Sequence, residues 1–181
     1  FKQMKALILT WEQFQDHELI YPYYRLDEEG FKVDIMANKT GRIFGILGAH
    51  MESTLNVSEL NDENRFEEIF NNYDFLVTPG GVKALEKLRQ EKKVLEFINK
   101  WNAANKVIAS ICHGGQLLIS SDILRDRDAS AYYSIKDDLI NAGANFVDGP
   151  AVRSGNLISC PHYKWLGPWM KEAIKVYREL S

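Results

Sequence analysis

The chain has 181 residues, of which 45% are hydrophobic, and its formal net charge at neutral pH is −3. This length and apolar content suit one well-buried core, so we expect a single domain over residues 1–181. The slight negative charge and the lack of a basic block argue against nucleic acid or an anionic membrane as a partner. No apolar run is long enough to span a membrane, and two cysteines without paired spacing fit a reducing compartment, so we expect a cytoplasmic protein.

Strand and helix patterns alternate along the chain. Residues 5–10 form an apolar run typical of a buried strand, and Asp16 is the predicted N-cap of a helix that runs towards Gly30. Pro22 lies inside this helix and predicts a kink or a later helix start. The further strands expected are residues 31–36, 74–78 and 106–111, and the further helices are residues 82–105, 116–124 and 164–180.

This alternation predicts a mostly parallel sheet with helices on both faces. Residues 145–160 are expected to add short strands around a turn at 154–156. Residues 41–61 are rich in glycine and mixed in polarity, which favours a loop or hairpin outside the core sheet and a candidate subunit contact. In such folds ligands bind at the carboxyl ends of the strands, where Glu18, Gly80 and Cys112 would gather.

The octapeptide ASICHGGQ, residues 109–116, places Cys112 at the junction between a strand and a helix. Gly114 and Gly115 relieve crowding at a tight bend, and the head of a helix offers unpaired N–H groups and the positive end of its dipole. Both effects favour a thiolate and hence a nucleophile at this turn. The alternative is a structural cysteine, since cysteine is commonly buried. A direct contact between Cys112 and His113 is not assumed, because adjacent side chains on such a turn diverge.

Three segments together resemble a known family: QDHELIYPYYRLDEEGFKV (15–33), VIASICHGGQLLIS (107–120) and YYSIKDDLINAG (132–143). They closely resemble the PfpI branch of the ThiJ/PfpI superfamily. The resemblance implies a flavodoxin-like α/β sandwich of the class I glutamine amidotransferase type, a reactive cysteine, and a homodimer or higher homo-oligomer. Members of this family act variously as proteases, deglycases, glyoxalases or stress chaperones, and no cofactor or metal is implied.

The resemblance also assigns roles to residues. Glu18 matches the carboxyl that lies against the cysteine sulfur, where it would hold its proton and serve as general acid or base. Without the resemblance, the residues alone favour a first-turn glutamate that complements a helix dipole. Gly80, Gly81 and the His113 N–H correspond to the oxyanion site.

The acidic residue that would orient His113 is harder to assign. Glu86 takes the family position, reaching across a subunit interface, only if one residue is inserted after the glycines. The alternative is a solvated helix face on which Glu86 pairs with Lys83 or Arg89.

Several positions depart from the family pattern. Gln15 stands where many relatives carry a second glutamate, and Gly115 replaces a usual proline. A Ser-Arg-x-Pro-x-Asp pattern common in relatives is here Ser159-Cys160-Pro161-His162-Tyr163-Lys164-Trp165. A metal site using Cys160 and His162 lacks a convincing fourth ligand. The expected pocket residues are Gln15, Tyr132, Cys160, His162 and Trp165, although Tyr132 is equally an ordinary core aromatic.

The sequence therefore predicts an enzyme in which Cys112 attacks a carbonyl of a small molecule or peptide while Glu18 and His113 move protons. The activity expected is glyoxalase-like, deglycase-like or peptidase-like. The alternative is a redox-responsive stress protein or chaperone in which Cys112 oxidises and turnover is slight.

Overall fold

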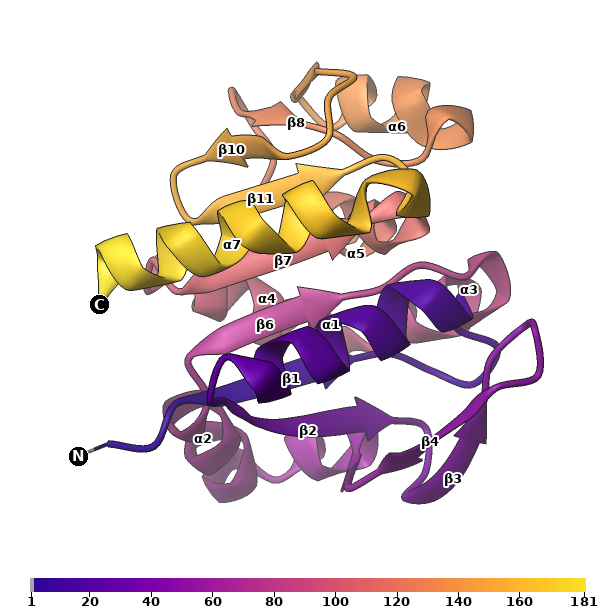
Figure 1. Cartoon of the computed structure of the whole chain (residues 1–181), viewed down its shortest axis with the longest axis vertical. Coiled ribbons are helices and arrows are strands. Elements are labelled where there is room, and N and C mark those ends of the chain that lie inside the picture. Colours follow the sequence, from indigo (N-terminus) through magenta and orange to yellow (C-terminus); the bar gives the residue numbers. More distant parts are fainter. Residues whose placement is uncertain (1) are drawn as a thin grey trace.

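A computed structural model describes residues 2–181. Its main sheet has seven strands in the order β10-β11-β7-β6-β1-β2-β5, and all neighbouring pairs are parallel except β10 with β11 (Figure 1). The strands are β1 (Lys5–Leu9), β2 (Lys32–Ala37), β5 (Leu55–Asn56), β6 (Phe75–Thr78), β7 (Val107–Ile111), β10 (Val152–Ser154) and β11 (Leu157–Cys160). The predicted flavodoxin-like sheet is confirmed.

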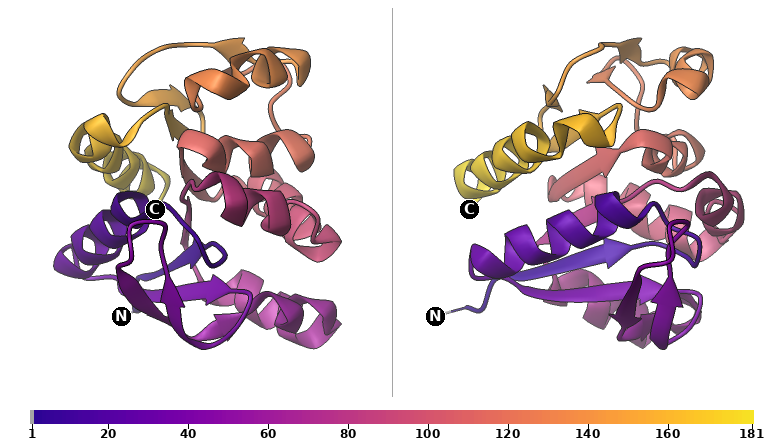
Figure 2. Two further views of the ribbon diagram at one scale, coloured as in Figure 1. Left: turned by 90° about the vertical axis from the view of Figure 1, so that its right-hand side faces the viewer. Right: turned by 45° about the vertical axis from the view of Figure 1, so that its right-hand side comes forward.

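Helices cover both faces of this sheet, as Figure 2 shows from two sides. The helices α1 (Asp16–Glu28) and α7 (Leu166–Leu180) pack on one face, and their apolar residues join those of one core cluster. The other face carries α2 (Glu63–Asn72), α3 (Val82–Leu88), α4 (Lys92–Ala103), α5 (Gly115–Ser120) and α6 (Lys136–Asn141). The central strands are apolar on both sides because both sides are covered.

The long helix expected over residues 82–105 is wrong, because the structure breaks it between α3 and α4. The segment from Arg89 to Lys93 is entirely polar and offers nothing to bury. Glu91 adopts an extended conformation there and starts α4 afresh. The helix expected over 116–124 is also shorter. It ends at Ser120. Asp122 adopts a left-handed backbone conformation, and the Ile123 N–H donates a hydrogen bond to the Leu118 carbonyl oxygen, which terminates the helix.

The predicted cap of α1 is wrong by one residue. The N-cap is Gln15, whose side chain accepts hydrogen bonds from the N–H groups of His17 and Glu18. Asp16 instead turns away and accepts from the N–H groups of Leu47 (2.8 Å) and Ala49 (2.9 Å). The helix starts before Pro22 and continues through it, so no late start occurs.

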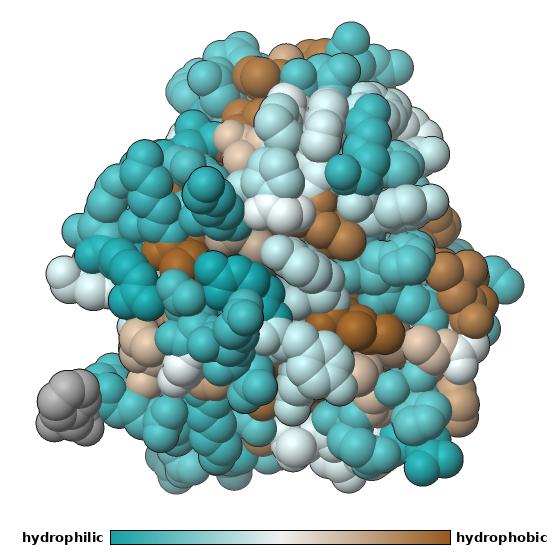
Figure 3. Space-filling view, in the orientation of Figure 1, coloured by the Kyte–Doolittle hydropathy of each residue, from teal (hydrophilic) through white to brown (hydrophobic). Residues whose placement is uncertain are grey.

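Residues 41–61 are partly as expected. The strands β3 (Gly41–Phe44) and β4 (His50–Ser53) form an antiparallel hairpin outside the main sheet, and its tip exposes Phe44, Ile46 and Leu47. Figure 3 shows brown, apolar surface at the right-hand edge, the side on which this hairpin lies in Figure 1. The expectation of a segment wholly outside the sheet is wrong, because β5 pairs with β2 and the 3-10 helix Val57–Asn61 follows it.

The carboxyl-terminal third contains the strands expected over residues 145–160. β9 (Asn145–Phe146) pairs with β8 (Asp128–Ala129) in a small separate ladder, whereas β10 and β11 form a hairpin on the main sheet. Among residues 2–181, no helix combines the length and the apolar character needed to cross a membrane.

Candidate active site

The turn after β7 holds Cys112 in an unusual backbone conformation. Its φ is 57°, in the left-handed region that non-glycine residues seldom adopt, and a short 3-10 turn over Cys112–Gly114 leads into α5. A Cβ on Gly114 would lie 2.1 Å from the Thr78 carbonyl oxygen, and one on Gly115 would lie 2.7 Å from the Ala131 Cβ. Close packing therefore requires both glycines, and the strained turn presents Cys112 at the carboxyl edge of the sheet.

Glu18 reaches this turn from the first turn of α1 and is fully buried. Its Oε1 accepts a hydrogen bond from the Gly80 N–H at 2.8 Å. Its Oε2 is buried without a hydrogen-bond partner among the described residues. Burial raises the pKa of Glu18 to about 8, although the Gly80 N–H and the Cys112 thiol act in the opposite direction. At neutral pH the protonated form of Glu18 is therefore favoured.

Gly80 lies between Glu18 and Cys112. A Cβ at this position would come within 2.4 Å of Glu18 Oε1 and 3.0 Å of the Cys112 Cβ. Only glycine leaves room for the carboxyl to approach the thiol. The Pro-Gly-Gly run predicts a turn, and the resemblance implies an oxyanion site at Gly80, but neither predicts that Gly80 makes room for the Glu18 carboxyl.

The thiol itself differs from expectation. Burial raises the pKa of Cys112 above its ordinary value, and the neighbouring Glu18 carboxylate raises it further, while the His113 backbone N–H lowers it. The lowered pKa predicted from the helix start is wrong. The 3-10 turn and six-residue α5 form too short a helix to supply a strong dipole, and desolvation of the sulfur outweighs it.

His113 lies against the thiol after all. Its Nδ1 is 3.6 Å from Cys112 Sγ, and its Nε2 is 3.3 Å from the Ser134 hydroxyl. The Tyr132 ring stacks on the imidazole with 5.0 Å between ring centroids. Burial lowers the pKa of His113, so the neutral imidazole is favoured and one nitrogen is free to accept a proton. Sequence reasoning did not single out Ser134, although it lies two residues after Tyr132.

The oxyanion groups are only partly free. The Gly80 N–H already donates to Glu18, and the His113 N–H is directed at the Cys112 sulfur. Gly81 has a φ of 110°, and a Cβ there would lie 2.7 Å from the Gln13 carbonyl oxygen. Close packing against the loop before α1 therefore requires a glycine at this position.

Glu86 is exposed on α3, and within this chain His113 has Ser134 as its partner instead. Arg89, one of the two cations expected beside Glu86, donates to the Ser120 hydroxyl at 2.9 and 3.0 Å. Glu86 lines an open hollow together with Gln13, Phe44 and Lys83. Its role across a subunit interface stays a prediction.

The other expected pocket residues occupy different places. Gln15 caps α1 and so positions Glu18. Cys160 is fully buried at the end of β11, and its thiol donates to the His162 carbonyl oxygen at 3.3 Å. His162 stacks on Tyr132 at 6.2 Å between centroids, and the half-buried Trp165 lies under the Lys164 ammonium. His162 and Tyr132 thus continue the row of rings that begins at His113.

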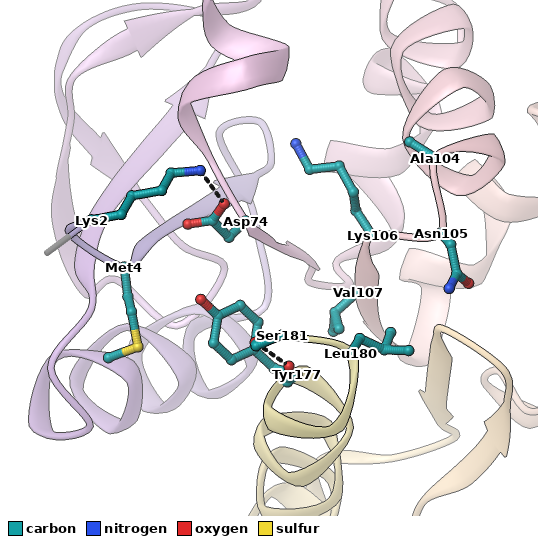
Figure 4. A pocket seen from close by; sticks show the side chains of 10 residues that line it. All are labelled: Lys2, Met4, Asp74, Ala104, Asn105, Lys106, Val107, Tyr177, Leu180 and Ser181. Carbon is teal, nitrogen blue, oxygen red and sulfur yellow. Dashed lines mark hydrogen bonds and ion pairs between the residues drawn. The ribbon is translucent and has the colours of Figure 1, made fainter.

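A separate hollow of about 330 Å³ opens at the opposite edge of the sheet, before the starts of β6 and β7 (Figure 4). Lys2 and Asp74 form an ion pair on one side of it, at 3.2 Å. Lys106 lies opposite them, and its ammonium sits 3.9 Å from the Trp101 ring. Because it lies at the amino ends of the strands, this hollow is distinct from the turn that carries Cys112.

Comparisons with known proteins identify the family of this chain. The sequence pattern of the DJ-1/PfpI family matches residues 4–176. A deglycase of Pyrococcus abyssi is 42% identical over 97% of this chain and 100% of its own length, and the deglycase PfpI of Pyrococcus furiosus is 39% identical over 97% of this chain and 100% of its own. A ThiJ/PfpI domain protein from Brachyspira murdochii superposes with a TM-score of 0.89 at 20% identity, covering all of both chains.

Proposed function

Because the chain belongs to the DJ-1/PfpI family, we propose that it is a cysteine-dependent enzyme that acts on a carbonyl substrate through Cys112. The observation that carries this proposal is the meeting of three groups at one turn. Cys112 Sγ lies 3.6 Å from a neutral imidazole and beside the protonated carboxyl of Glu18. An acid and a base that flank one nucleophile are the parts that carbonyl addition needs.

The proposed first step is addition to an aldehyde or ketone. His113 Nδ1 takes the thiol proton while Cys112 Sγ forms a bond to the carbonyl carbon. The carbonyl oxygen then takes the Glu18 proton, which gives a neutral hemithioacetal, and the imidazolium returns its proton to Glu18. Glu18 suits this role because burial keeps it protonated at the pH at which the imidazole is neutral.

Among carbonyl reactions we favour removal of early glycation adducts, because relatives at about 40% identity over their whole length are deglycases. The test measures lactate release from methylglyoxal adducts of N-acetylarginine and from free methylglyoxal, and peptide release from casein. We expect turnover of the adduct and its loss in Cys112→Ala, with Lys83→Ala, on the exposed face of α3, as a matched control. Lactate from free methylglyoxal alone would indicate a glyoxalase, and peptide release alone would indicate a peptidase.

A second candidate, a redox-responsive protein with little turnover, is favoured by one observation. Cys112 is only 8% exposed, which suits a small oxidant better than a bulky substrate. Absence of turnover on all three substrates, together with oxidation of Cys112 by peroxide, would favour this candidate over the enzyme.

A further inference from the structure

The second cysteine lies next to the first across a parallel strand pair. In the register of β11 and β7, Cys160 pairs with Ile111, the residue before Cys112, and Figure 1 shows the two strands side by side. Ile111 is still extended, with φ −140° and ψ 143°, so the strand geometry continues to the Cα of Cys112. With strands about 4.8 Å apart and a rise of about 3.3 Å per residue, the two cysteine Cα atoms lie roughly 6 Å apart.

That separation lies within the range of about 4.4 to 6.8 Å between the Cα atoms of disulfide-bonded cysteines. The two side chains also share one side of the sheet, since both belong to the core cluster beneath α1 and α7. The groups also interact electrostatically: the Cys160 thiolate raises the pKa of Cys112, and the Glu18 carboxylate raises the pKa of both thiols. Cys160, Cys112 and Glu18 therefore form one buried group.

Exposure divides the roles of the two thiols. Cys112 is 8% exposed, whereas Cys160 is completely covered and its thiol has only the His162 carbonyl as partner. An external oxidant reaches Cys112 first. Cys160 is the other cysteine of the chain, and its burial shields it from oxidants and from other thiols in solution.

We propose that Cys160 is the resolving thiol of Cys112, so that oxidation by a hydroperoxide ends in an internal Cys112–Cys160 disulfide. In the first step, the Cys112 sulfur attacks one peroxide oxygen, the O–O bond breaks, and Cys112 becomes a sulfenic acid with release of water or an alcohol. In the second step, the Cys160 sulfur attacks the sulfenic sulfur, the S–O bond breaks, and the hydroxyl leaves as water with the Cys160 proton. The two thiols lose two electrons, which the peroxide gains.

This inference does not depend on the proposed enzyme activity. A disulfide blocks the nucleophile reversibly, whereas further peroxide would convert an unresolved sulfenic acid into a sulfinic acid that ordinary thiols do not reduce. The pair would thus protect Cys112 from permanent loss. The competing product is the sulfinate of Cys112. Mass spectrometry distinguishes the two products, because the disulfide loses two hydrogens and the sulfinate gains two oxygens.

The test treats the full-length protein with one and then ten equivalents of hydrogen peroxide, followed by intact mass, peptide mapping and free-thiol counting. We expect the wild type to lose two hydrogens and both free thiols, with a Cys112–Cys160 cross-linked peptide that dithiothreitol removes. Cys160→Ser should instead gain two oxygens on Cys112, and dithiothreitol should not reverse this. Cys160→Ala serves as a second variant, with thermal unfolding to show that each variant is folded.

A wild-type protein that gains two oxygens on Cys112 while Cys160 stays free would overturn the proposal. A disulfide between two chains, seen on a non-reducing gel, would do the same. These readouts need no turnover, so a protein that lacks activity on every carbonyl substrate can still confirm the disulfide.

Discussion

At the scale of single residues, the ionisation of Cys112 depends on the ionisation of Glu18, because each residue shifts the pKa of the other. Both are buried, and desolvation raises both pKa values, so the two groups together carry two protons at neutral pH. The Glu18 carboxyl loses its proton first, with a pKa of about 8, and its negative charge then raises the pKa of Cys112. Thiolate therefore forms at Cys112 when His113 takes the thiol proton during the reaction.

Replacing Glu18 by Gln should alter how stability depends on pH. The pKa of Glu18 rises from 4.5 to about 8 on folding, so its favourable contribution is complete below 4.5 and is lost as pH rises to about 8. Between pH 5 and 8 the wild type should lose about 3 kcal/mol of unfolding free energy relative to Glu18→Gln, at about 1.4 kcal/mol per pKa unit. Urea unfolding of both proteins at the two pH values checks this, and parallel curves would contradict it.

Alkylation should distinguish the two thiols. Iodoacetamide should modify Cys112 much faster than Cys160, because only the Cys112 side chain reaches solvent. The rate at Cys112 should not rise as pH passes about 8, because the Glu18 carboxylate that forms there raises the pKa of Cys112. Peptide mass spectrometry over time gives both rates. Equal rates in the folded protein, with wild-type circular dichroism, would show that exposure does not control them.

At the scale of elements, one carboxylate fastens α1 to the β3–β4 hairpin. Asp16 is nearly fully buried and accepts hydrogen bonds from the Leu47 and Ala49 N–H groups. Gly45 packs so tightly on it that a Cβ there would lie 2.4 Å from the carboxyl. The hairpin is therefore held beside the first turn of the helix that carries Glu18.

Asp16→Ala should release the hairpin tip. Loss of two charge-assisted hydrogen bonds should cost about 2 to 4 kcal/mol of unfolding free energy. Hydrogen exchange should speed up at the Leu47 and Ala49 amides in particular. Asp27→Ala, on the exposed side of the same helix, is the control and should change stability by less than about 0.5 kcal/mol. Unchanged exchange at the hairpin tip in Asp16→Ala would show that other contacts hold it.

At the scale of the whole molecule, the carboxyl edge of the sheet carries both the candidate site and the exposed apolar surface. Phe44, Ile46 and Leu47 of the hairpin and Val82 at the start of α3 are all at least 45% exposed. Phe44 and Glu86 line one hollow. Apolar surface of this kind marks contacts between proteins, and we propose a contact between copies of this chain.

Mixing two inactive variants tests whether Glu86 completes the site of a partner chain. Cys112→Ala retains Glu86, and Glu86→Gln retains Cys112, so a mixed dimer contains one complete site. We expect each variant alone to lose most turnover. In an equal mixture, random pairing makes about half of the dimers mixed, and each mixed dimer should have the turnover of one wild-type site. Sedimentation velocity establishes the assembly. A fully active monomer at nanomolar concentration, or a Glu86→Gln variant with wild-type turnover, would leave Glu86 as a surface charge.

The sequence by itself determined the sheet, the turn at Cys112 and the family. Apolar runs and glycines are local signals that predict strands and turns. The family resemblance adds that the Glu18 carboxyl lies against the Cys112 thiol, which no local pattern predicts. These signals also placed Cys112, His113 and Glu18 at one edge, since parallel strands end together.

Only the tertiary structure decided how those groups behave. The pKa of Cys112 rises rather than falls, because desolvation depends on what covers the sulfur, and residues far away in the sequence cover it. The choice of Gln15 over Asp16 as cap depended on the distant Leu47 and Ala49 amides, which compete for the carboxylate. Likewise, Cys160 gained its place beside Cys112 from the register of two strands joined through 45 intervening residues, 112–156. Burial, competition for partners and strand register are non-local, and so the sequence pattern could not contain them.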